Sequence, residues 1–406
     1  MTEENKSVKN FPNRVPKLRF PEFREEWEVK KLGEICKMQA GKFVSASEIL
    51  KETNNKLYPC YGANGLRGFT YSYNYDGEYS LIGRQGALCG NITRVYDKFY
   101  ATEHAVVVTP KDKVHSNWLF YLLNYLNLNQ YATGMAQPGL SVQNLLEVES
   151  IITDSIEEQK KIASSLSLID NRISTQKKII EQLETLMKVS RTNIFSQKLR
   201  FKNEQGYDFP NWEKLKLGEI GNFQTSSIDK LSRENENEVY LVNYMNVYRH
   251  EDINSTTIKS FQKVTAKEQQ ITSCNLKKGD ILFTPSSETP DDIGHSVVIS
   301  ENLENAVFSY HLMRFRPKIE IDILYSHYFC NVPIVLSQLS KFATGSTRFT
   351  ISVKSFSDVE ISIPSLPEQK VIGKFLSVIE NKIEAEKQIL EKLELQKKFL
   401  LANLFV

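Results

Sequence analysis

The chain has 406 residues, of which 41% are hydrophobic and 25% are charged, and its formal net charge is +2. This length predicts at least two domains, and the composition is ordinary for a soluble globular protein. There is no apolar run of about 18 residues, and the segment MTEENKSVKN lacks the apolar core of a signal peptide. A cytoplasmic protein without a membrane span is therefore expected. The cysteines (Cys36, Cys60, Cys89, Cys274 and Cys330) form no CxxC pair, which predicts buried thiols without a disulfide framework or a zinc site.

Three segments of the first half of the chain recur in the same order in the second half. The pairs are LRFPEFREEWEVKKLGEI (18–35) with LRFKNEQGYDFPNWEKLKLGEI (199–220), ATGMAQPGLSV (132–142) with ATGSTRFTISV (343–353), and EEQKKIASSLSLIDNRISTQKKIIEQLE (157–184) with PEQKVIGKFLSVIENKIEAEKQILEKLE (367–394). Such ordered self-similarity indicates a duplicated unit of about 200 residues.

The segments between these repeats predict the globular domains. Residues 57–110 and 239–316 contain short β-prone runs cut by Gly, Asn and Asp, which is typical of β-rich domains with many turns, and a short helix such as 117–127 is expected beside each sheet. The predicted fold class is α+β. The predicted limits are an N-terminal tail at 1–16, a first domain at 17–154, a first long helix at 155–198, a second domain at 199–364 and a second long helix at 365–406.

Both long helices carry apolar residues in two interleaved seven-residue series, which predicts a coiled-coil seam of about five heptads. The seam is expected to use Ile162, Leu166, Ile169, Ile173, Ile180, Leu183 and Met187 in the first helix, and Ile372, Leu376, Ile379, Ile383, Leu390 and Leu393 in the second. Gln176 and Glu386 occupy the same seam position, where a polar side chain fixes register. The simplest arrangement is an antiparallel pair within the chain. The alternative is an ordinary amphipathic helix that packs on its own domain.

The start of each long helix shows the same pattern, Ser155-x-x-Glu158 and Ser365-x-x-Glu368. A serine followed three residues later by glutamate predicts a capping box, in which both side chains satisfy backbone donors of the first turn.

The order of these parts resembles a known family. The motifs that carry the resemblance are the paired LGEI segments, YGANG and GEYSLIGRQGA in the first half, KKGDILFTPSSETPDDIGHS in the second half, and P-x-L-P-E-Q before the final helix. From about Leu18 to Val406, the chain resembles the specificity subunit of a type I restriction-modification enzyme. The resemblance implies a non-catalytic subunit with two target-recognition domains, each of which reads one half of a split, asymmetric DNA site in the major groove.

The resemblance also implies partners. They are double-stranded DNA, two methyltransferase subunits docked on the paired helices, and two restriction subunits in the full complex. The helices would set the spacer between the half-sites, and the complex would carry out adenine methylation and ATP-dependent restriction. S-adenosylmethionine, ATP and Mg²⁺ are expected in the partner subunits, with no cofactor in this chain.

Direct readout of DNA uses side chains that present paired donors or acceptors to base edges. Suitable residues lie in turn-rich segments of both domains: Tyr61, Asn64, Arg67, Arg84, Gln85 and Gln137 in the first, and Asn243, Asn246, Ser286, Ser287, Thr347 and Arg348 in the second. Solvated surface residues are the alternative for each. Between Arg172 and Arg200 the chain carries seven basic and two acidic residues, which suits either phosphate contact or a solvated helix face.

Catalytic motifs are missing from the sequence. There is no Asn/Asp-Pro-Pro-aromatic stretch for a flipped base, no Gly-rich loop for S-adenosylmethionine and no nucleotide-binding phosphate loop. The segment SSETPDDIGHS gathers Ser287, Asp291, Asp292 and His295, and a structured loop is expected there in preference to a triad or a metal-nuclease cluster. The competing function is a coiled-coil protein-interaction scaffold without sequence-specific DNA binding.

Overall fold

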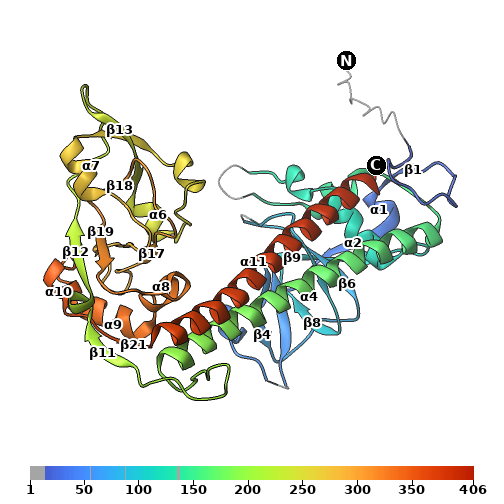
Figure 1. The fold of residues 1–406 in the computed structure, drawn as a ribbon. Coiled ribbons are helices and arrows are strands. Elements are labelled where there is room, and N and C mark those ends of the chain that lie inside the picture. The colour runs from blue at the N-terminus through green and yellow to red at the C-terminus, as the bar shows by residue number, and fades with distance from the viewer. Residues whose placement is uncertain (1–13, 55, 87, 135–137) are drawn as a thin grey trace. The chain divides into compact units, whose positions relative to one another are not determined.

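The computed structural model describes residues 14–54, 56–86, 88–134 and 138–406, which form two compact units. The first unit contains the chain up to Lys178 together with Gln388–Val406, and the second contains Ile179–Lys387. Each unit holds one β-rich domain and one part of each long helix, α4 (Ile156–Phe195) and α11 (Leu366–Asn403) (Figure 1).

The domain of the first unit is built on two four-stranded sheets, with strand orders β2-β9-β6-β7 and β4-β3-β8-β5. Its elements are β1 (Glu28–Lys31), α1 (Leu32–Ile35), β2 (Cys36–Ala40), β3 (Tyr58–Gly62), β4 (Gly65–Thr70), β5 (Tyr75–Asp76), β6 (Tyr79–Gly83), β7 (Ile92–Val95), β8 (Lys98–Ala101), β9 (Ala105–Pro110), α2 (Ser116–Tyr125), α3 (Val142–Leu146) and β10 (Glu149–Ile152). The first sheet is antiparallel throughout, whereas β3 and β8 in the second sheet run parallel.

The domain of the second unit has a four-stranded sheet, β12-β19-β15-β17, and a three-stranded sheet, β14-β13-β18. Its elements are β11 (Glu213–Lys216), α5 (Leu217–Ile220), β12 (Gly221–Thr225), β13 (Asn237–Val242), α6 (Tyr244–Tyr248), β14 (Lys263–Ala266), α7 (Glu268–Cys274), β15 (Ile281–Phe283), β16 (Ser286–Ser287), β17 (Ser296–Val298), β18 (Ala306–Phe308), β19 (Met313–Pro317), α8 (Ile323–Phe329), α9 (Pro333–Phe342), β20 (Phe349–Thr350), α10 (Val353–Ser357) and β21 (Glu360–Ile363).

The two domains share one topology, which confirms the predicted duplication. The order β2-β9-β6-β7 corresponds to β12-β19-β15-β17, and the parallel pair β3/β8 corresponds to the parallel pair β13/β18. In both units the strand before the LGEI helix pairs with the strand before a long helix, as β1 with β10 and β11 with β21. The duplication therefore extends through segments whose sequences no longer match.

Ion pairs within each unit give the direction of the long helices. In the first unit Asp170 pairs with Lys397 at 2.7 Å and Lys177 with Glu394 at 2.9 Å. In the second unit Glu184 pairs with Lys387 at 2.8 Å. As the residue number rises along α4 it falls along α11, so the helices pack antiparallel, and the predicted coiled-coil arrangement is confirmed. The polar seam residue Gln176 is only 8% exposed and Glu386 only 7%.

The apolar seam faces inward along both helices. Eight of its residues are buried and five are half-buried; the buried ones are Ile162, Leu166, Ile169, Ile180, Ile372, Leu376, Ile379 and Leu393, and the half-buried ones are Ile173, Leu183, Met187, Ile383 and Leu390.

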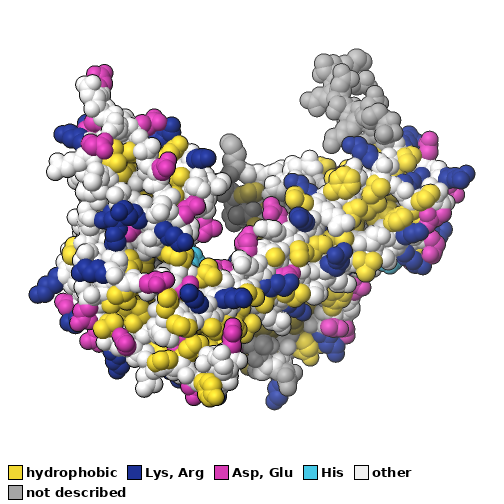
Figure 2. Space-filling view, viewed as in Figure 1, with side chains coloured by type: hydrophobic (Ala, Val, Ile, Leu, Met, Phe, Trp, Pro, Cys, Tyr) yellow, Lys and Arg dark blue, Asp and Glu magenta, His cyan; other side chains and the backbone are white. Residues whose placement is uncertain are grey.

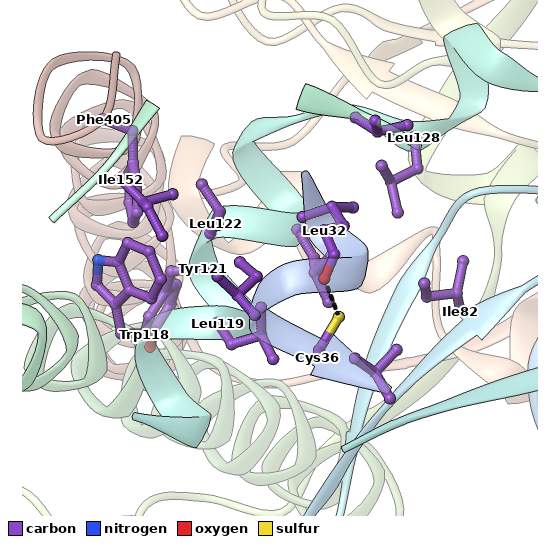
Figure 3. Close-up of a cluster of buried hydrophobic side chains, with 14 of the residues drawn as sticks. Leu32, Cys36, Ile82, Trp118, Leu119, Tyr121, Leu122, Leu128, Ile152 and Phe405 are labelled. Atoms are coloured by element: carbon purple, nitrogen blue, oxygen red, sulfur yellow. Dashed lines mark hydrogen bonds between the residues drawn. The ribbon is translucent and has the colours of Figure 1, made fainter. Parts of the chain in front are cut away.

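Each long helix starts on one domain and ends in the core of the other unit. In the first unit the core around Trp118 and Leu122 is completed by Leu404 and by Phe405, whose ring centroid lies 6.0 Å from that of Trp118 (Figure 3). In the second unit Ile194 at the end of α4 belongs to the buried core. Both domains therefore depend on residues that are distant in sequence.

A buried glutamate near the start of each long helix anchors the segment that opens each repeat. Glu158, 1% exposed, accepts hydrogen bonds from Arg19 Nε at 2.8 Å, Arg19 Nη2 at 3.0 Å and Trp27 Nε1 at 3.3 Å. Glu368, fully buried, accepts equivalent bonds from Arg200 at 2.8 and 2.9 Å and from Trp212 Nε1 at 3.0 Å.

The capping-box prediction is therefore wrong for both glutamates. Ser155 Oγ does accept a hydrogen bond from the Glu158 amide at 3.3 Å, but Ser365 Oγ is buried and has no hydrogen-bond partner in the described parts of the chain. The carboxylates bind arginine and tryptophan side chains because a buried charge needs an opposite charge and several donors, which the first turn of a helix alone does not supply.

The next residue in each helix fixes the neighbouring domain helix. Gln159 Oε1 accepts a hydrogen bond from the His115 amide at 2.8 Å, directly before α2, and Gln369 Oε1 accepts one from the Asp322 amide at 2.9 Å, directly before α8. The repeated Glu-Gln pair thus attaches each domain rigidly to its own long helix.

Candidate nucleic-acid interface

The repeated ATG loop of the first unit is a closed turn docked on the end of β6. Thr133 and Gly139 exchange two backbone hydrogen bonds of 2.9 Å, which close the turn. The Leu140 amide then donates to the Arg84 carbonyl at 2.9 Å, and the Gly86 amide donates to the Pro138 carbonyl at 3.1 Å. The turn is therefore held beside Arg84 and Gln85.

The second copy of the loop repeats this geometry. Thr344 and Thr350 exchange backbone hydrogen bonds of 3.0 and 2.9 Å, and the Ile351 amide donates to the Pro285 carbonyl at 2.9 Å. The short ladder between β20 and β16 places Thr350 opposite Ser286. The frame is preserved because the backbone bonds do not depend on the residues between them, so the side chains at the tip are free to differ.

A hairpin tip in the first unit meets the segment on which the loop docks. The turn between β3 and β4 carries Asn64, and its Ala63 carbonyl lies so close to Gly83 that a Cβ added there would be 2.1 Å from the oxygen. Because Gly83 directly precedes Arg84, the hairpin, the Arg84 segment and the ATG loop converge at one end of the domain.

Replacing Gly83 with alanine should separate these segments. The new methyl group has to displace the Ala63 carbonyl, and overpacking of this kind costs on the order of 2 kcal/mol. The expected result is lower stability of the first domain, measured by urea denaturation. Gly139→Ala is the matched control, because among the described residues its Cβ would meet the Arg84 carbonyl alone, at an ordinary 3.7 Å. Equal stability of the two variants would contradict the close approach.

The predicted DNA-reading residues of the first unit differ in how far their side chains are exposed to solvent. Arg67 and Asn64 are exposed, and Arg84 and Gln85 are half-buried, with Arg84 Nε buried and without a hydrogen-bond partner among the described residues. Tyr61 packs edge-on against Phe99, at 6.0 Å between centroids, and burial raises the pKa of its hydroxyl. Gln137 lies outside the described residues.

In the second unit the predicted residues gather around Ser286. Arg348 Nη2 donates a hydrogen bond to Ser286 Oγ at 3.2 Å, and Tyr244 OH, from α6, donates to the Ser286 carbonyl at 2.9 Å. Ser286 and Ser287 are buried, whereas Thr347 and Arg348 are exposed. The arginine of the second loop is therefore anchored through one terminal nitrogen of its guanidinium group and is exposed to solvent.

The side chains of Asn243 and Asn246 form hydrogen bonds inside the second unit. Asn246 Oδ1 accepts a hydrogen bond from the Asn243 amide at 2.8 Å, and Asn246 Nδ2 donates to Glu251 at 2.7 Å. Asn243 Nδ2 donates to Gln262 Oε1 at 3.1 Å. Both side chains help to fix the start of α6 beside the Ser286 segment.

A polar network beside this surface was not expected from the sequence. His295 Nε2 lies 2.8 Å from Asp292 Oδ1, and His295 Nδ1 lies 3.2 Å from His250 Nε2. Both ring nitrogens of His295 are thus engaged away from Ser287, so no Ser-His-Asp triad assembles there. The described part of the chain has no group of three or more His, Cys, Asp or Glu residues placed to hold a metal ion.

Three of the seven basic residues between Arg172 and Arg200 are used internally. Lys177 pairs with Glu394, Arg200 with Glu368, and Arg191 donates a hydrogen bond to the Asn331 carbonyl at 2.7 Å. These contacts favour a structural role for the three residues over phosphate contact.

The ionisation of the cysteine thiols is opposed by their burial. All the described cysteines are free and buried, which confirms the prediction of buried thiols, and burial raises the pKa of Cys36 to about 12.

No described helix has both the length and the apolar character needed to cross a membrane.

Comparison with known proteins gives one consistent family. The chain matches the type I restriction modification DNA specificity domain twice, over residues 24–185 and 210–395. The EcoprrI specificity subunit of a type I restriction enzyme from Escherichia coli is 48% identical over 154 residues, a match that covers 38% of this chain and 38% of that protein. The MjaVIII specificity subunit from Methanocaldococcus jannaschii is 26% identical over 401 residues, covering 94% of this chain and 92% of that protein.

A solved structure shares the fold. The S subunit of a type I restriction-modification system from M. genitalium superimposes with a TM-score of 0.63 at 17% identity, over 97% of this chain and 99% of that one.

Proposed function

Because the chain belongs to the type I restriction modification DNA specificity family, with two matches that together span most of its length, we propose that each recognition domain reads one half of a two-part DNA site. The chain is a DNA-recognition subunit and not itself an enzyme. In this proposal the domains at 17–154 and 199–364 contact separate half-sites in the major groove, and α4 with α11 sets the spacer between them.

The observation that carries the proposal is the loop built twice on one backbone frame with different side chains. Thr133 and Gly139 close it in one domain and Thr344 and Thr350 in the other, and each loop docks on the equivalent segment, at Arg84 or at Pro285. A protein that reads an asymmetric site with a duplicated fold needs such a frame, because position has to be kept while base contacts change.

The side chains available at each surface suit direct readout. In the second domain Arg348 presents a planar guanidinium, the group that binds guanine O6 and N7 as a pair. In the first domain Arg67 and Asn64 at the hairpin, and Arg84 with Gln85 beside the loop, offer arginine and amide groups for guanine and adenine. The two surfaces therefore favour different half-sites.

The outward flank of the helices supports docking of methyltransferase subunits, one on each unit. Leu168 is 64% exposed and Phe399 60% in the first unit, and Val378 is 60% and Val189 50% exposed in the second. Leu168 and Val378 occupy equivalent positions of the two helices, as do Val189 and Phe399. Leu168 and Val378 directly precede the seam residues Ile169 and Ile379, whereas the ion-paired residues Lys177, Glu184, Lys387 and Glu394 directly follow seam positions, so the apolar and the charged residues lie on opposite flanks of the seam.

Hydrophobic side chains are visible at the surface along the long helices (Figure 2). Exposed apolar residues of this kind mark contact surfaces. In this proposal S-adenosylmethionine is bound by two docked methyltransferase subunits, and ATP with Mg²⁺ by two restriction subunits.

The experiment that tests the proposal is a map of DNA methylation. The chain is expressed with its methyltransferase partner in a host without adenine methylation, and modified adenines are located by single-molecule sequencing. The expected result is one motif made of two defined half-sites separated by a fixed number of unspecified bases.

Co-purification of the partner is the control for assembly. An assembled complex, supplied with S-adenosylmethionine, that leaves the host DNA unmodified would contradict the proposal and favour a coiled-coil scaffold. A motif with a single uninterrupted core would contradict the two-reader arrangement.

A further inference from the structure

Two histidines of the second unit face each other through their ring nitrogens. His250 Nε2 lies 3.2 Å from His295 Nδ1. His250 stands just after α6, and His295 stands directly before β17. The contact therefore joins α6 to the segment that begins with Ser286 and Ser287.

In each ring, the nitrogen that does not face the other histidine (the outer nitrogen) has a partner that accepts a hydrogen bond. His250 Nδ1 lies 3.2 Å from the Ser296 carbonyl oxygen, which can only accept. His295 Nε2 lies 2.8 Å from Asp292 Oδ1, and the other oxygen of this carboxylate accepts a hydrogen bond from Tyr248 OH at 3.0 Å. Both outer nitrogens must therefore carry a proton.

The contact between the two facing (inner) nitrogens then depends on how many protons the four ring nitrogens of the pair carry in total. With two protons on the pair, the inner nitrogens point lone pairs at each other and no hydrogen bond joins the rings. A third proton makes an N–H···N hydrogen bond. A fourth proton places two N–H groups face to face. Only the three-proton state links His250 to His295.

The surroundings decide which ring holds the extra proton. Burial lowers the pKa of His250, the hydrogen bond to the Ser296 carbonyl raises it, and the nearby His295, His327 and Arg191 lower it. The ring of His327 in turn lies 3.7 Å from Glu380 Oε1. The third proton is assigned to His295 by geometry, because an oxygen of the Asp292 carboxylate faces the outer nitrogen of this ring and stabilises a cation there.

We propose that His250 and His295 are positioning residues that hold the reading surface of the second unit through one shared proton. This inference rests on the proposed function of that surface. The link reaches the surface because Tyr244, on the same helix α6, donates a hydrogen bond to the Ser286 carbonyl, and Ser286 Oγ holds Arg348. When the histidine contact is lost, α6 loses one of its ties to the Ser286 segment, and the hydrogen bonds made by Tyr244 OH, Tyr248 OH and His250 Nδ1 remain.

The sign of the pH dependence follows from the proton count. As the pH rises and the third proton leaves, the link is lost. As the pH falls and His250 takes up a fourth proton, against its lowered pKa, the link is lost again. Histidine titrates between about pH 5 and 8, so sequence recognition by the second unit follows a bell-shaped profile in this range.

The experiment measures DNA binding by the chain assembled with its methyltransferase partner. Duplexes carrying a substituted base pair in one half-site or the other are compared with the full site, from about pH 5 to about pH 8 at constant ionic strength. We expect discrimination in the second unit's half-site to fall about tenfold at both ends of the range, as for loss of one charge-assisted hydrogen bond. Discrimination in the first unit's half-site, the internal control, should not show this profile.

Two variants separate the shared proton from folding. His250→Asn keeps a donor for the Ser296 carbonyl, and His295→Gln keeps a donor for Asp292, but neither retains the inner contact. Each should bind DNA with weaker discrimination in the second half-site and with a flat profile. A bell-shaped profile that persists in both variants would overturn the inference.

A readout without DNA keeps this inference separate from the proposed function. In the chain with ¹⁵N-labelled histidine, a pH titration followed by NMR should pass through a state with one neutral and one doubly protonated ring for the pair. A pair that passes directly from two neutral rings to two doubly protonated rings would overturn the inference even if DNA recognition holds. Loss of the profile on adding a chelator would also overturn it, because a metal ion would then bridge the inner nitrogens. A three-proton pair in a chain with no sequence-specific DNA binding would overturn the proposed function instead.

Discussion

Replacing Glu158 with glutamine is expected to lower the free energy of unfolding of the first unit by about 3 kcal/mol. Glu158 Oε2 accepts from Arg19, Trp27 and Thr153, and Oε1 accepts from Arg19. An amide at this place loses the charge and turns an NH₂ group toward donors. The Arg19 guanidinium, with its side chain 12% exposed, is then left without its counter-charge.

Urea denaturation followed by tryptophan fluorescence measures this effect, because Trp27 is one of the residues that contact the carboxylate. The matched control is Glu157→Gln, one residue earlier in α4. Glu157 pairs with Lys160 in a setting where the two side chains are 69% and 50% exposed, so its replacement should cost less than about 1 kcal/mol. Similar denaturation curves for the two variants would mean that the buried pair does not hold the domain.

Replacing Arg348 with alanine should weaken binding to the full site about 10- to 100-fold and remove base preference at one position of one half-site. Arg348 is exposed at the tip of the second loop, and its guanidinium donates a hydrogen bond to Ser286 Oγ. The loss should be confined to one half because the first domain does not contain this residue. Methylation mapping of the variant complex gives the changed motif directly.

Two further variants test whether Arg348 reads a base. Arg348→Lys keeps the charge but not the two-donor geometry, so it should retain salt-dependent binding and still lose base preference. Lys341→Ala, at an exposed position of α9, should change affinity equally for all sequences if it changes it at all. An unchanged motif in the alanine variant of Arg348 would show that this arginine does not read the site.

The long helices and the duplication were predictable because their signals are periodic. The seven-residue spacing of apolar residues predicted the antiparallel pair of helices. The identical length of the ATG loop in the two copies predicted that both loops share one backbone frame. Sequence alone also brought Arg348 and Ser286 into one list of reading residues, although 62 positions separate them, and the structure supplies the hydrogen bond between them. Which of these residues touch bases stays a prediction.

The buried glutamates were misassigned because capping is a local rule. The sequence nevertheless held a signal for the true contact: arginine, tryptophan and glutamate recur together in both repeats, as Arg19, Trp27 and Glu158 in the first. Residue types retained at three distant places suggest that they meet. The histidine pair gave no such signal, because His250 and His295 lie 45 positions apart and belong to segments of the chain outside the three repeats.

The exchange of helix ends between the units has a consequence for synthesis on the ribosome. The core of the first domain includes Leu404 and Phe405, and the whole of the second unit, Ile179–Lys387, is translated before them. The first domain to emerge is therefore unable to complete its core until the second has been made. A nonsense mutation at any codon that precedes Leu404 would remove Leu404 and Phe405 and so damage the recognition domain of the first unit.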